Sequence, residues 1–161
     1  MEIETKPNKN DIVEKNTAEF YSYINFAKGI SQSCPDIYFF ITNCAVNKAL
    51  NLMMNKGVSQ KEEKKINEII NSFLQHLAQS GWDAKYMSRQ KYCMFLDHYF
   101  KTIKWEEATL DTYILSNSLL NLLLSFGKFD PNSQETSNYF KEKIAELQKK
   151  EEEEEDCKMD E

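Results

Sequence analysis

The feature that most constrains the fold is the scarcity of residues that break helices. The chain has 161 residues but only four glycines and three prolines. A fold of many short strands needs turn residues roughly every 8 to 12 positions, and glycine and proline supply most of them. Lysine, glutamate and leucine, which favour helices, are abundant instead. The sequence therefore predicts an all-α fold of about six to seven helices.

Three helices are predicted in the first half of the chain, where apolar residues recur at helical spacing. They are expected at residues 17–30, 35–56 and 59–80. The signals for their starts are a possible cap, a first-turn proline and a capping-box serine, namely Thr17, Pro35 and Ser59. Gly57 and Gly81 suit the ends of the second and third helices. Residues 1–16 are polar, and we expect a flexible N-terminus there.

Three further helices are predicted in the second half. The fourth runs to about Trp105, the fifth starts at Thr109 or Asp111, and the sixth starts at Asn132 or Ser133. Between the last two, Gly127 is expected to end a helix in the left-handed conformation, and "FDPN" to form a turn. Residues 151–156 place six acids at a helix C-terminus, where the helix dipole opposes them. Residues 151–161 are therefore expected to form an acidic disordered tail.

Charge and hydropathy exclude two classes of partner. The formal net charge is −6, and Arg89 is the single arginine, so the chain lacks the cations that bind nucleic acid. Its apolar stretches are shorter than the ~20 residues that cross a bilayer, and no signal sequence opens the chain. We therefore expect a soluble, cytoplasmic protein.

No constellation of side chains predicts an enzyme, a metal site or a cofactor. His76 and His98 lie on different predicted helices without a carboxylate or thiol at ligand spacing. The four cysteines are not paired in sequence, so neither a metal site nor disulfides are expected. No nucleophile motif and no glycine-rich phosphate loop is present. We therefore expect no catalytic residues, no metal site and no cofactor.

Three segments resemble the VTA/LYST-interacting-protein family, in the order and at the spacing of that family. The first two are "AEFYSYINFAKGISQSCPDIYFFITNCAVNKAL", with its proline and aromatic pair, and "EIINSFLQHLA". The third is "LSNSLLNLLLSFGKFDPNSQETSNYFKEKIAEL", in which an apolar helix ends in Phe-Gly and the next helix carries a tyrosine. The resemblance covers roughly residues 17–148.

The resemblance implies two tandem three-helix modules of the microtubule-interacting-and-transport (MIT) type, at residues 17–81 and 82–150. It also implies a non-enzymatic adaptor of the ESCRT and multivesicular-body pathway, peripheral on endosomes, that binds the C-terminal tails of ESCRT-III subunits. Family members dock an AAA ATPase through a further C-terminal domain. This sequence ends in an acidic segment instead, so either it is a fragment or it lacks that activity. As given, we expect a monomer that does not stimulate the ATPase.

The physical mechanism implied is the packing of a partner's amphipathic helix into a groove between two helices. In the first module, the apolar residues of the second and third helices spread over more than one face, and Leu74 and Leu77 match family positions that meet partner tails. Gln75 and Ala78 replace flanking acids of the family, and Glu68 is the expected substitute. The predicted partner-binding residues of this module are Met53, Glu68, Ile70, Leu74 and Leu77.

In the second module, Glu142 stands where the family has a tryptophan three residues after Tyr139. Binding there is expected to be weaker and to rest on Leu120, Leu124 and Tyr139. Two other interpretations stay open. One is a general helical-bundle scaffold that binds a different amphipathic peptide, and the other is a small all-α enzyme.

Overall fold

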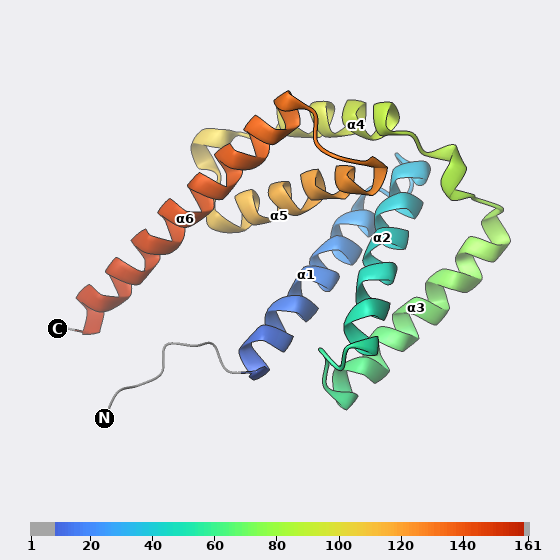
Figure 1. Cartoon of the computed structure of the whole chain (residues 1–161), viewed down its shortest axis with the longest axis horizontal. Coiled ribbons are helices and arrows are strands. Elements are labelled where there is room, and N and C mark those ends of the chain that lie inside the picture. Colours follow the sequence, from blue (N-terminus) through green and yellow to red (C-terminus); the bar gives the residue numbers. More distant parts are fainter. Residues whose placement is uncertain (1–8, 160–161) are drawn as a thin grey trace. The chain divides into compact units, whose positions relative to one another are not determined.

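The computed structural model describes the backbone of residues 9–159 and the side chains of residues 17–155. Within that range the secondary structure is helical, without strands, so the predicted all-α class is confirmed (Figure 1). The α-helices are α1 (Lys9–Gly29), α2 (Pro35–Met54), α3 (Gln60–Ser80), α4 (Arg89–Thr102), α5 (Leu110–Asn121) and α6 (Pro131–Met159). Short 3-10 helices are η1 (Ala84–Tyr86), η2 (Trp105–Glu107) and η3 (Leu122–Phe126).

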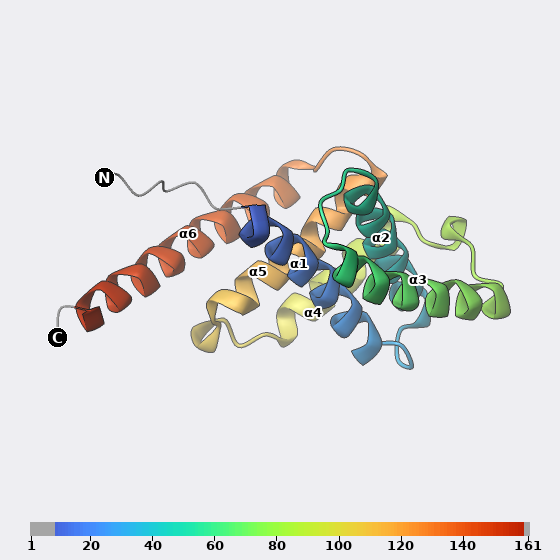
Figure 2. The ribbon, with the colours of Figure 1, turned by 90° about the horizontal axis from the view of Figure 1, so that it is seen from below.

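The chain divides into two compact units, residues 1–87 and residues 88–161. Unit 1 contains α1, α2 and α3, and unit 2 contains α4, α5 and α6. In unit 1, α1 and α2 pack along each other, and α3 packs on α2 (Figures 1 and 2). In unit 2, α5 and α6 form the most extensive pair, and α4 packs on α5 and η3.

The core of unit 1 is formed by the apolar stripes of its three helices. Helix α2 is the central element because it contacts both neighbours, and it contributes the largest share of buried side chains. Helix α3 buries one stripe of side chains, which are spaced one helical turn apart. Helix α1 buries a stripe of side chains against α2. The stripe of α1 consists of Phe20, Tyr23, Ile24 and Ala27. The stripe of α3 consists of Ile66, Ile70 and Phe73.

The starts of the unit 1 helices agree only partly with the predicted signals. Pro35 is the first residue of α2, and the Ser59 side chain accepts a hydrogen bond from the Glu62 amide at the start of α3, as predicted. Thr17 is not a cap, because α1 begins at Lys9 and Thr17 is buried inside it. The correction has a physical cause: residues 9–16 contain no glycine or proline that would stop the helix, and their two apolar residues, Ile12 and Val13, are too few to signal a stripe.

The end of α2 uses an unexpected residue. Lys56, not Gly57, adopts the left-handed conformation, with φ of 56°. The Lys56 amide donates to the Met53 carbonyl at 3.1 Å, and the Gly57 amide donates to the Leu52 carbonyl at 2.7 Å. This pair of bonds is the Schellman pattern. Gly57 is required for a different reason, since a Cβ there would lie 3.2 Å from the Leu52 carbonyl oxygen.

The core of unit 2 is an aromatic cluster that joins its elements. Trp105 of η2 stacks on Phe140 of α6, with ring centroids 5.6 Å apart, and Phe100 of α4 meets Phe140 edge-on at 5.4 Å. Tyr113 of α5 contacts Trp105 at 5.4 Å. On the other side of this core, the Tyr92 hydroxyl donates to the Leu119 carbonyl at 2.6 Å. These contacts tie α4, α5 and α6 to one centre.

Two end signals of unit 2 differ from the predictions. Gly127 has φ of 124° and ψ of −166°, which is an extended conformation available to glycine and not the left-handed helical one. Asp130 caps α6, because its carboxylate accepts a hydrogen bond of 2.7 Å from the Ser133 amide, and Pro131 is the first helical residue. The predicted starts at Asn132 or Ser133 are therefore one or two residues late.

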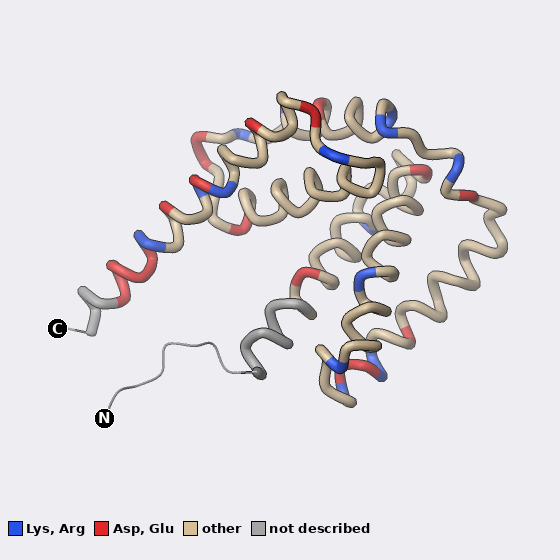
Figure 3. Tube along the Cα trace, in the orientation of Figure 1, with Lys and Arg blue, Asp and Glu red and all other residues tan. Residues whose placement is uncertain are grey.

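Helix α6 continues through the acidic run, which was expected to be disordered. Its last turns extend beyond the other helices of unit 2 (Figures 1 and 2), and the side chains of Glu151–Glu155 are exposed. In the sequence these acids follow Lys149 and Lys150, and Figure 3 shows a basic stretch followed by an acidic one near the end of α6. Full exposure to water lets the acids share one helix, since solvent screens charges at the surface.

Candidate functional site

An apolar surface lies along α2 and α3 of unit 1. Leu50 and Met54, one turn apart on α2, are 40% and 80% exposed, and Leu74 of α3 is 48% exposed. We call these three side chains the α2–α3 face. Leu74 lies beside the buried stripe of α3, on the side opposite Ile69, which borders a cavity shared with α1. Leu74 is therefore directed away from that cavity.

The α3 part of this surface is almost free of charge. Glu68 is the one Asp, Glu, Lys or Arg between Ile66 and Ser80 (Figure 3). Exposed large apolar side chains are expensive to leave in water, and clusters of them mark interaction sites in soluble proteins. Leu50 and Met54 lie in the last turns of α2, whereas Leu74 lies near His76, which contacts Tyr38 in the first turn of α2. A partner helix would therefore have to run along α2 and α3 for about 15 Å to contact all three residues.

The predicted partner-binding residues of unit 1 do not all share this surface. Ile70 is 4% exposed, so its assignment to an outer strip is wrong. It continues the buried stripe with Ile66 and Phe73 at spacings of four and three residues. Met53 and Leu77 are half-buried, whereas Leu74 and Glu68 are exposed, and Glu68 borders the cavity near α1.

The predicted residues of unit 2 are also split between core and surface. Leu120 is 3% exposed and belongs to the core, which argues against direct contact with a partner. Leu124 and Tyr139 are exposed. The Tyr139 ring meets Tyr113 edge-on at 6.3 Å, and the Lys143 ammonium lies 5.9 Å from its centre. Glu142 is exposed and fills no apolar site.

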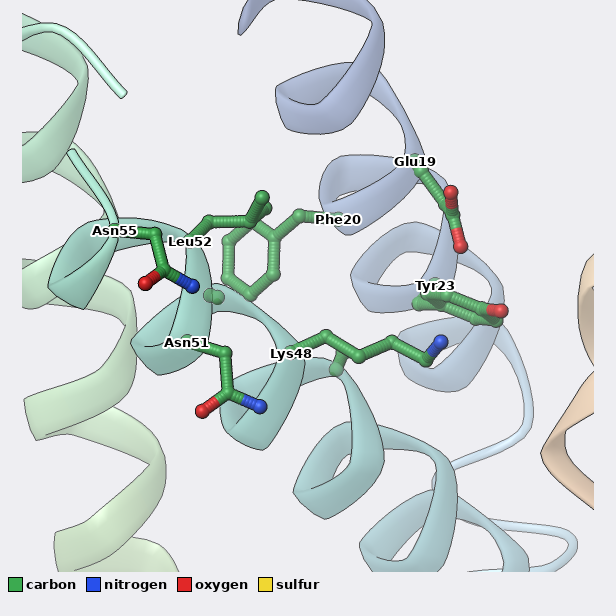
Figure 4. A pocket seen from close by; sticks show the side chains of 9 residues that line it. Glu19, Phe20, Tyr23, Lys48, Asn51, Leu52 and Asn55 are labelled. Atoms are coloured by element: carbon green, nitrogen blue, oxygen red, sulfur yellow. The ribbon is translucent and has the colours of Figure 1, made fainter. Parts of the chain in front are cut away.

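One cavity of unit 1 lies between α1 and α2 and has a volume of about 250 Å³. Figure 4 shows its apolar lining, which includes Phe20 and Leu52, and the polar side chains of Glu19, Lys48 and Asn55 at its border. Near its α2 wall, burial raises the pKa of the Cys44 thiol to about 11, although Lys48 acts in the opposite direction. A thiol of this kind is a poor nucleophile at neutral pH.

The second cavity, of about 240 Å³, involves all three helices of unit 1. Ile24 and Lys28 of α1 form one side, Thr42 of α2 lies between, and Glu68 and Phe73 of α3 form the other side. At one end the Tyr38 hydroxyl lies 3.2 Å from His76 Nδ1. Burial raises the pKa of Tyr38, so its hydroxyl stays protonated across the physiological range. We call this space the α1–α3 cavity.

Among the described residues, no group of three or more His, Cys, Asp and Glu side chains could hold a metal ion. The thiols of Cys34, Cys44 and Cys93 are free. His76 contacts the rings of Tyr38 and Phe39, with centroids 5.6 and 5.2 Å away, so it serves in packing.

Sequence reasoning missed Thr42 and Lys28, which line the α1–α3 cavity. No local signal could have found them, because the cavity exists only where three helices meet. Leu50 and Met54 could be read as apolar residues of a broad stripe on α2, but their exposure depends on where α3 packs.

Comparison of the chain with known protein families, curated proteins and solved structures finds no match. In the part of the chain that the structure describes, no helix combines the length and the apolar character needed to cross a bilayer.

Proposed function

We propose that this protein is a non-enzymatic adaptor that binds amphipathic C-terminal tails of ESCRT-III subunits by helix-in-groove packing. The observation that carries the proposal is the α2–α3 face, where Leu50, Met54 and Leu74 are exposed on two neighbouring helices. The sequence resemblance to the VTA/LYST-interacting-protein family supplies the class of partner. Contact with endosomal membranes is then indirect, through the bound subunit.

The energetics suit a reversible interaction. Full burial of one leucine or methionine side chain contributes about 1.5–3 kcal/mol, and each of these three residues has only part of its surface left to bury. Binding also costs translational and rotational freedom. Three partly exposed anchors therefore support weak to moderate affinity, as expected for a subunit that is captured and released.

A charge-assisted contact adds direction to this interaction. Glu68 is exposed on α3 and makes no ion pair with any described residue. Glu68 borders the α1–α3 cavity, on the side of α3 opposite Leu74, so a basic residue of the partner pairs with it only where the partner also extends to that side. An exposed pair of this kind contributes up to about 1 kcal/mol, so it orients the helix more than it holds it.

Unit 2 is proposed to hold a second and weaker site, around Leu124 and Tyr139, which are exposed on η3 and α6. Tyr139 supplies an aromatic ring with a polar tip, the type of residue enriched at the centre of interfaces.

The test measures binding of a panel of ESCRT-III tail peptides by fluorescence anisotropy. Leu74→Asp is expected to abolish binding and leave the helical signal and thermal unfolding nearly unchanged, because Leu74 is half-exposed. The matched control is Gln79→Asp, which places the same charge on an exposed residue of α3 about 140° around the helix from Leu74. Equal binding by both variants, or binding by neither, would refute the assignment of this face.

A general scaffold for amphipathic helices is the second candidate. The near absence of charge on the exposed part of α3 favours it, because charged groups provide most of the discrimination between partners. Unrelated amphipathic helical peptides distinguish the two candidates. If they bind as tightly as ESCRT-III tails and compete for Leu74, the general scaffold is correct.

A further inference from the structure

The methionines of the chain differ widely in their exposure to water. Met54, the last residue of α2, is 80% exposed, the largest exposed fraction among the large apolar side chains of the described residues. Met94 of α4 is 65% exposed, whereas Met53 is half-buried and Met87 is 6% exposed. A reagent dissolved in water therefore reaches Met54 and Met94 before it reaches Met53 and Met87.

Met54 is also the one residue of the α2–α3 face that contains an oxidisable atom. The side chains of Leu50 and Leu74 consist of carbon and hydrogen only, so an oxidant attacks this face at the Met54 sulfur. The same side chain is the most adaptable part of the face, because a methionine is unbranched and its sulfur is polarizable. Adaptable contact and chemical reactivity are thus combined in one exposed residue.

Oxidation of this sulfur changes how the face meets a partner. Methionine sulfoxide is polar, because its added oxygen accepts hydrogen bonds. In the unbound protein that oxygen meets water, since Met54 is exposed. Under an apolar partner helix the oxygen is buried without a hydrogen-bond donor, which weakens binding. The face has only three apolar side chains, so a change in one of them affects a large part of the contact.

We propose that Met54 is a modification site at which oxidation by a hydroperoxide prevents the α2–α3 face from binding its partner. The sulfur attacks the terminal oxygen of the hydroperoxide and gives up two electrons. The O–O bond breaks, an S–O bond forms, and the hydroperoxide proton moves to the oxygen that leaves as water or an alcohol. A thiol-dependent sulfoxide reductase reverses the change, since two thiols become a disulfide and the sulfoxide oxygen leaves as water. This regulation rests on the proposed function, because it acts on the surface that binds the partner.

The first experiment measures the order in which the methionines react. The full chain is treated with increasing amounts of hydrogen peroxide, digested with trypsin and analysed by tandem mass spectrometry. Trypsin gives separate peptides for residues 49–56, 86–89 and 92–101, which contain Met53 and Met54, Met87, and Met94. Met54 is expected to react well before Met87, because it is exposed and Met87 is buried. Equal rates for these two residues would overturn the proposal.

The second experiment measures partner binding by the reduced and the oxidised chain. Excess peroxide is removed with catalase, and fluorescence anisotropy follows the binding of ESCRT-III tail peptides and of unrelated amphipathic helical peptides. The oxidised chain is expected to bind about tenfold more weakly, and treatment with reductases for both sulfoxide epimers should restore the affinity.

The outcomes of this experiment separate the regulation from the proposed function. An oxidised chain that binds as tightly as the reduced chain would overturn the regulation and leave the proposed function intact. A reduced chain that binds none of the peptides would refute the proposed function, and the regulation would fail with it.

Two variants show whether Met54 is the residue responsible. Met54→Leu keeps an apolar side chain of similar volume without a sulfur atom, so it should bind like the wild type and be insensitive to peroxide. Met94→Leu is the matched control, because it removes an exposed methionine of unit 2 and should stay sensitive. Both variants keep all four cysteines, so oxidation of thiols cannot explain a difference between them. If Met54→Leu loses binding after peroxide treatment as the wild type does, the proposal is wrong.

A third variant tests the effect of polarity without any oxidant. Met54→Gln places an acceptor oxygen on a side chain of similar length, and it should bind about tenfold more weakly than Met54→Leu. The urea midpoints of unit 1 should be nearly equal in the two variants, because residue 54 is exposed. Equal binding by both would mean that a polar group at this position does not affect the partner, which would overturn the proposal.

Discussion

The two units are both built from three helices, but their aromatic residues occupy different positions. In unit 2, rings from α4, η2, α5 and α6 meet in one cluster around Phe140. In unit 1, the rings gather where the first turns of α2 meet the last turns of α3. Phe39 contacts Phe73 at 6.3 Å and stacks on Trp82 at 5.7 Å.

This difference shows how similar helix content can give one unit a closed centre and the other an adaptable surface. Large rigid rings fill the space between helices efficiently, so the centre of unit 2 is fixed by packing. In unit 1 the rings secure one end of the α2–α3 contact. Its remaining length relies on smaller aliphatic side chains, and both cavities described above lie in this unit. A partner can therefore add to unit 1 without displacing a core residue.

The largest expected effect is that of Phe140→Ala, which removes the centre of the unit 2 cluster. Phe140 is buried and contacts Phe100, Trp105 and Tyr113, so the variant should lose about 3–5 kcal/mol of stability in unit 2. The chain has two tryptophans, Trp82 in unit 1 and Trp105 in unit 2. Urea unfolding followed by the fluorescence of single-tryptophan variants reports each unit separately.

The contrast between the units would be wrong if Phe140→Ala shifted the urea midpoint reported by Trp82 as much as the midpoint reported by Trp105. Such a result would mean that the two units unfold as one cooperative body. Phe73→Ala is the matched change in unit 1, because Phe73 is buried and contacts the rings of Tyr38 and Phe39. It should shift the Trp82 transition and leave the Trp105 transition in place.

The second prediction concerns two neighbouring apolar residues of α3. Ile70→Ala should destabilise unit 1 by about 2–5 kcal/mol, because Ile70 is buried in the core. Leu74→Ala, four residues away and half-exposed, should cost less than about 1 kcal/mol. Urea midpoints of the Trp82 transition give both values. Equal losses would show that Leu74 is a core residue and that the α2–α3 face is closed.

This pair also shows what the sequence can and cannot predict about the site. Helical spacing placed Ile70 and Leu74 on α3 and made both apolar candidates for contact. Which of them points inward depends on the angle at which α3 packs on α2, and the period of 3.6 residues leaves adjacent strips ambiguous. Leu120 raises the same difficulty, because Leu119, Leu120, Leu122 and Leu123 are buried whereas Leu124 in η3 is exposed.

The fold was more predictable than the site because its signals are local. The all-α class follows from composition, and caps such as Ser59 and breaks such as Gly81 are set by residues within one turn. The start of α1 and the length of α6 were not predictable in this way. Both ends are polar segments that carry no apolar stripe, so only continuation of the backbone hydrogen bonds extends them.

The third prediction compares the residues that end α2 and η3. Gly127 holds a backbone conformation that is available almost only to glycine, so Gly127→Ala should destabilise unit 2 by about 1–3 kcal/mol. Lys56 holds a left-handed conformation that glycine adopts without strain, so Lys56→Gly should stabilise unit 1 by about 0.5–1 kcal/mol. The two tryptophan transitions measure these opposite signs. A loss of stability in Lys56→Gly would mean that the lysine side chain makes a compensating contact.

The smallest expected effect is the pH dependence of the α6 cap in unit 2. The Ser133 amide donates to the Asp130 carboxylate, and this hydrogen bond lowers the pKa of Asp130 below its ordinary value of 3.8. Because the pKa is lower in the folded state than in the unfolded one, the charged cap stabilises unit 2 fully above about pH 4 to 5, and this contribution is lost as the pH falls through the folded-state pKa. Asp130→Asn keeps an oxygen that can cap the helix but cannot titrate. The wild type should therefore be the more stable protein at pH 7, and the difference between the two Trp105 transitions should shrink towards zero between pH 5 and pH 2.

The corresponding cap of α3, Ser59, has no titratable side chain, so Ser59→Ala should lower the stability of unit 1 by an amount that does not change over this range. A constant difference between wild type and Asp130→Asn at all pH values would show that the carboxylate charge contributes nothing to the cap.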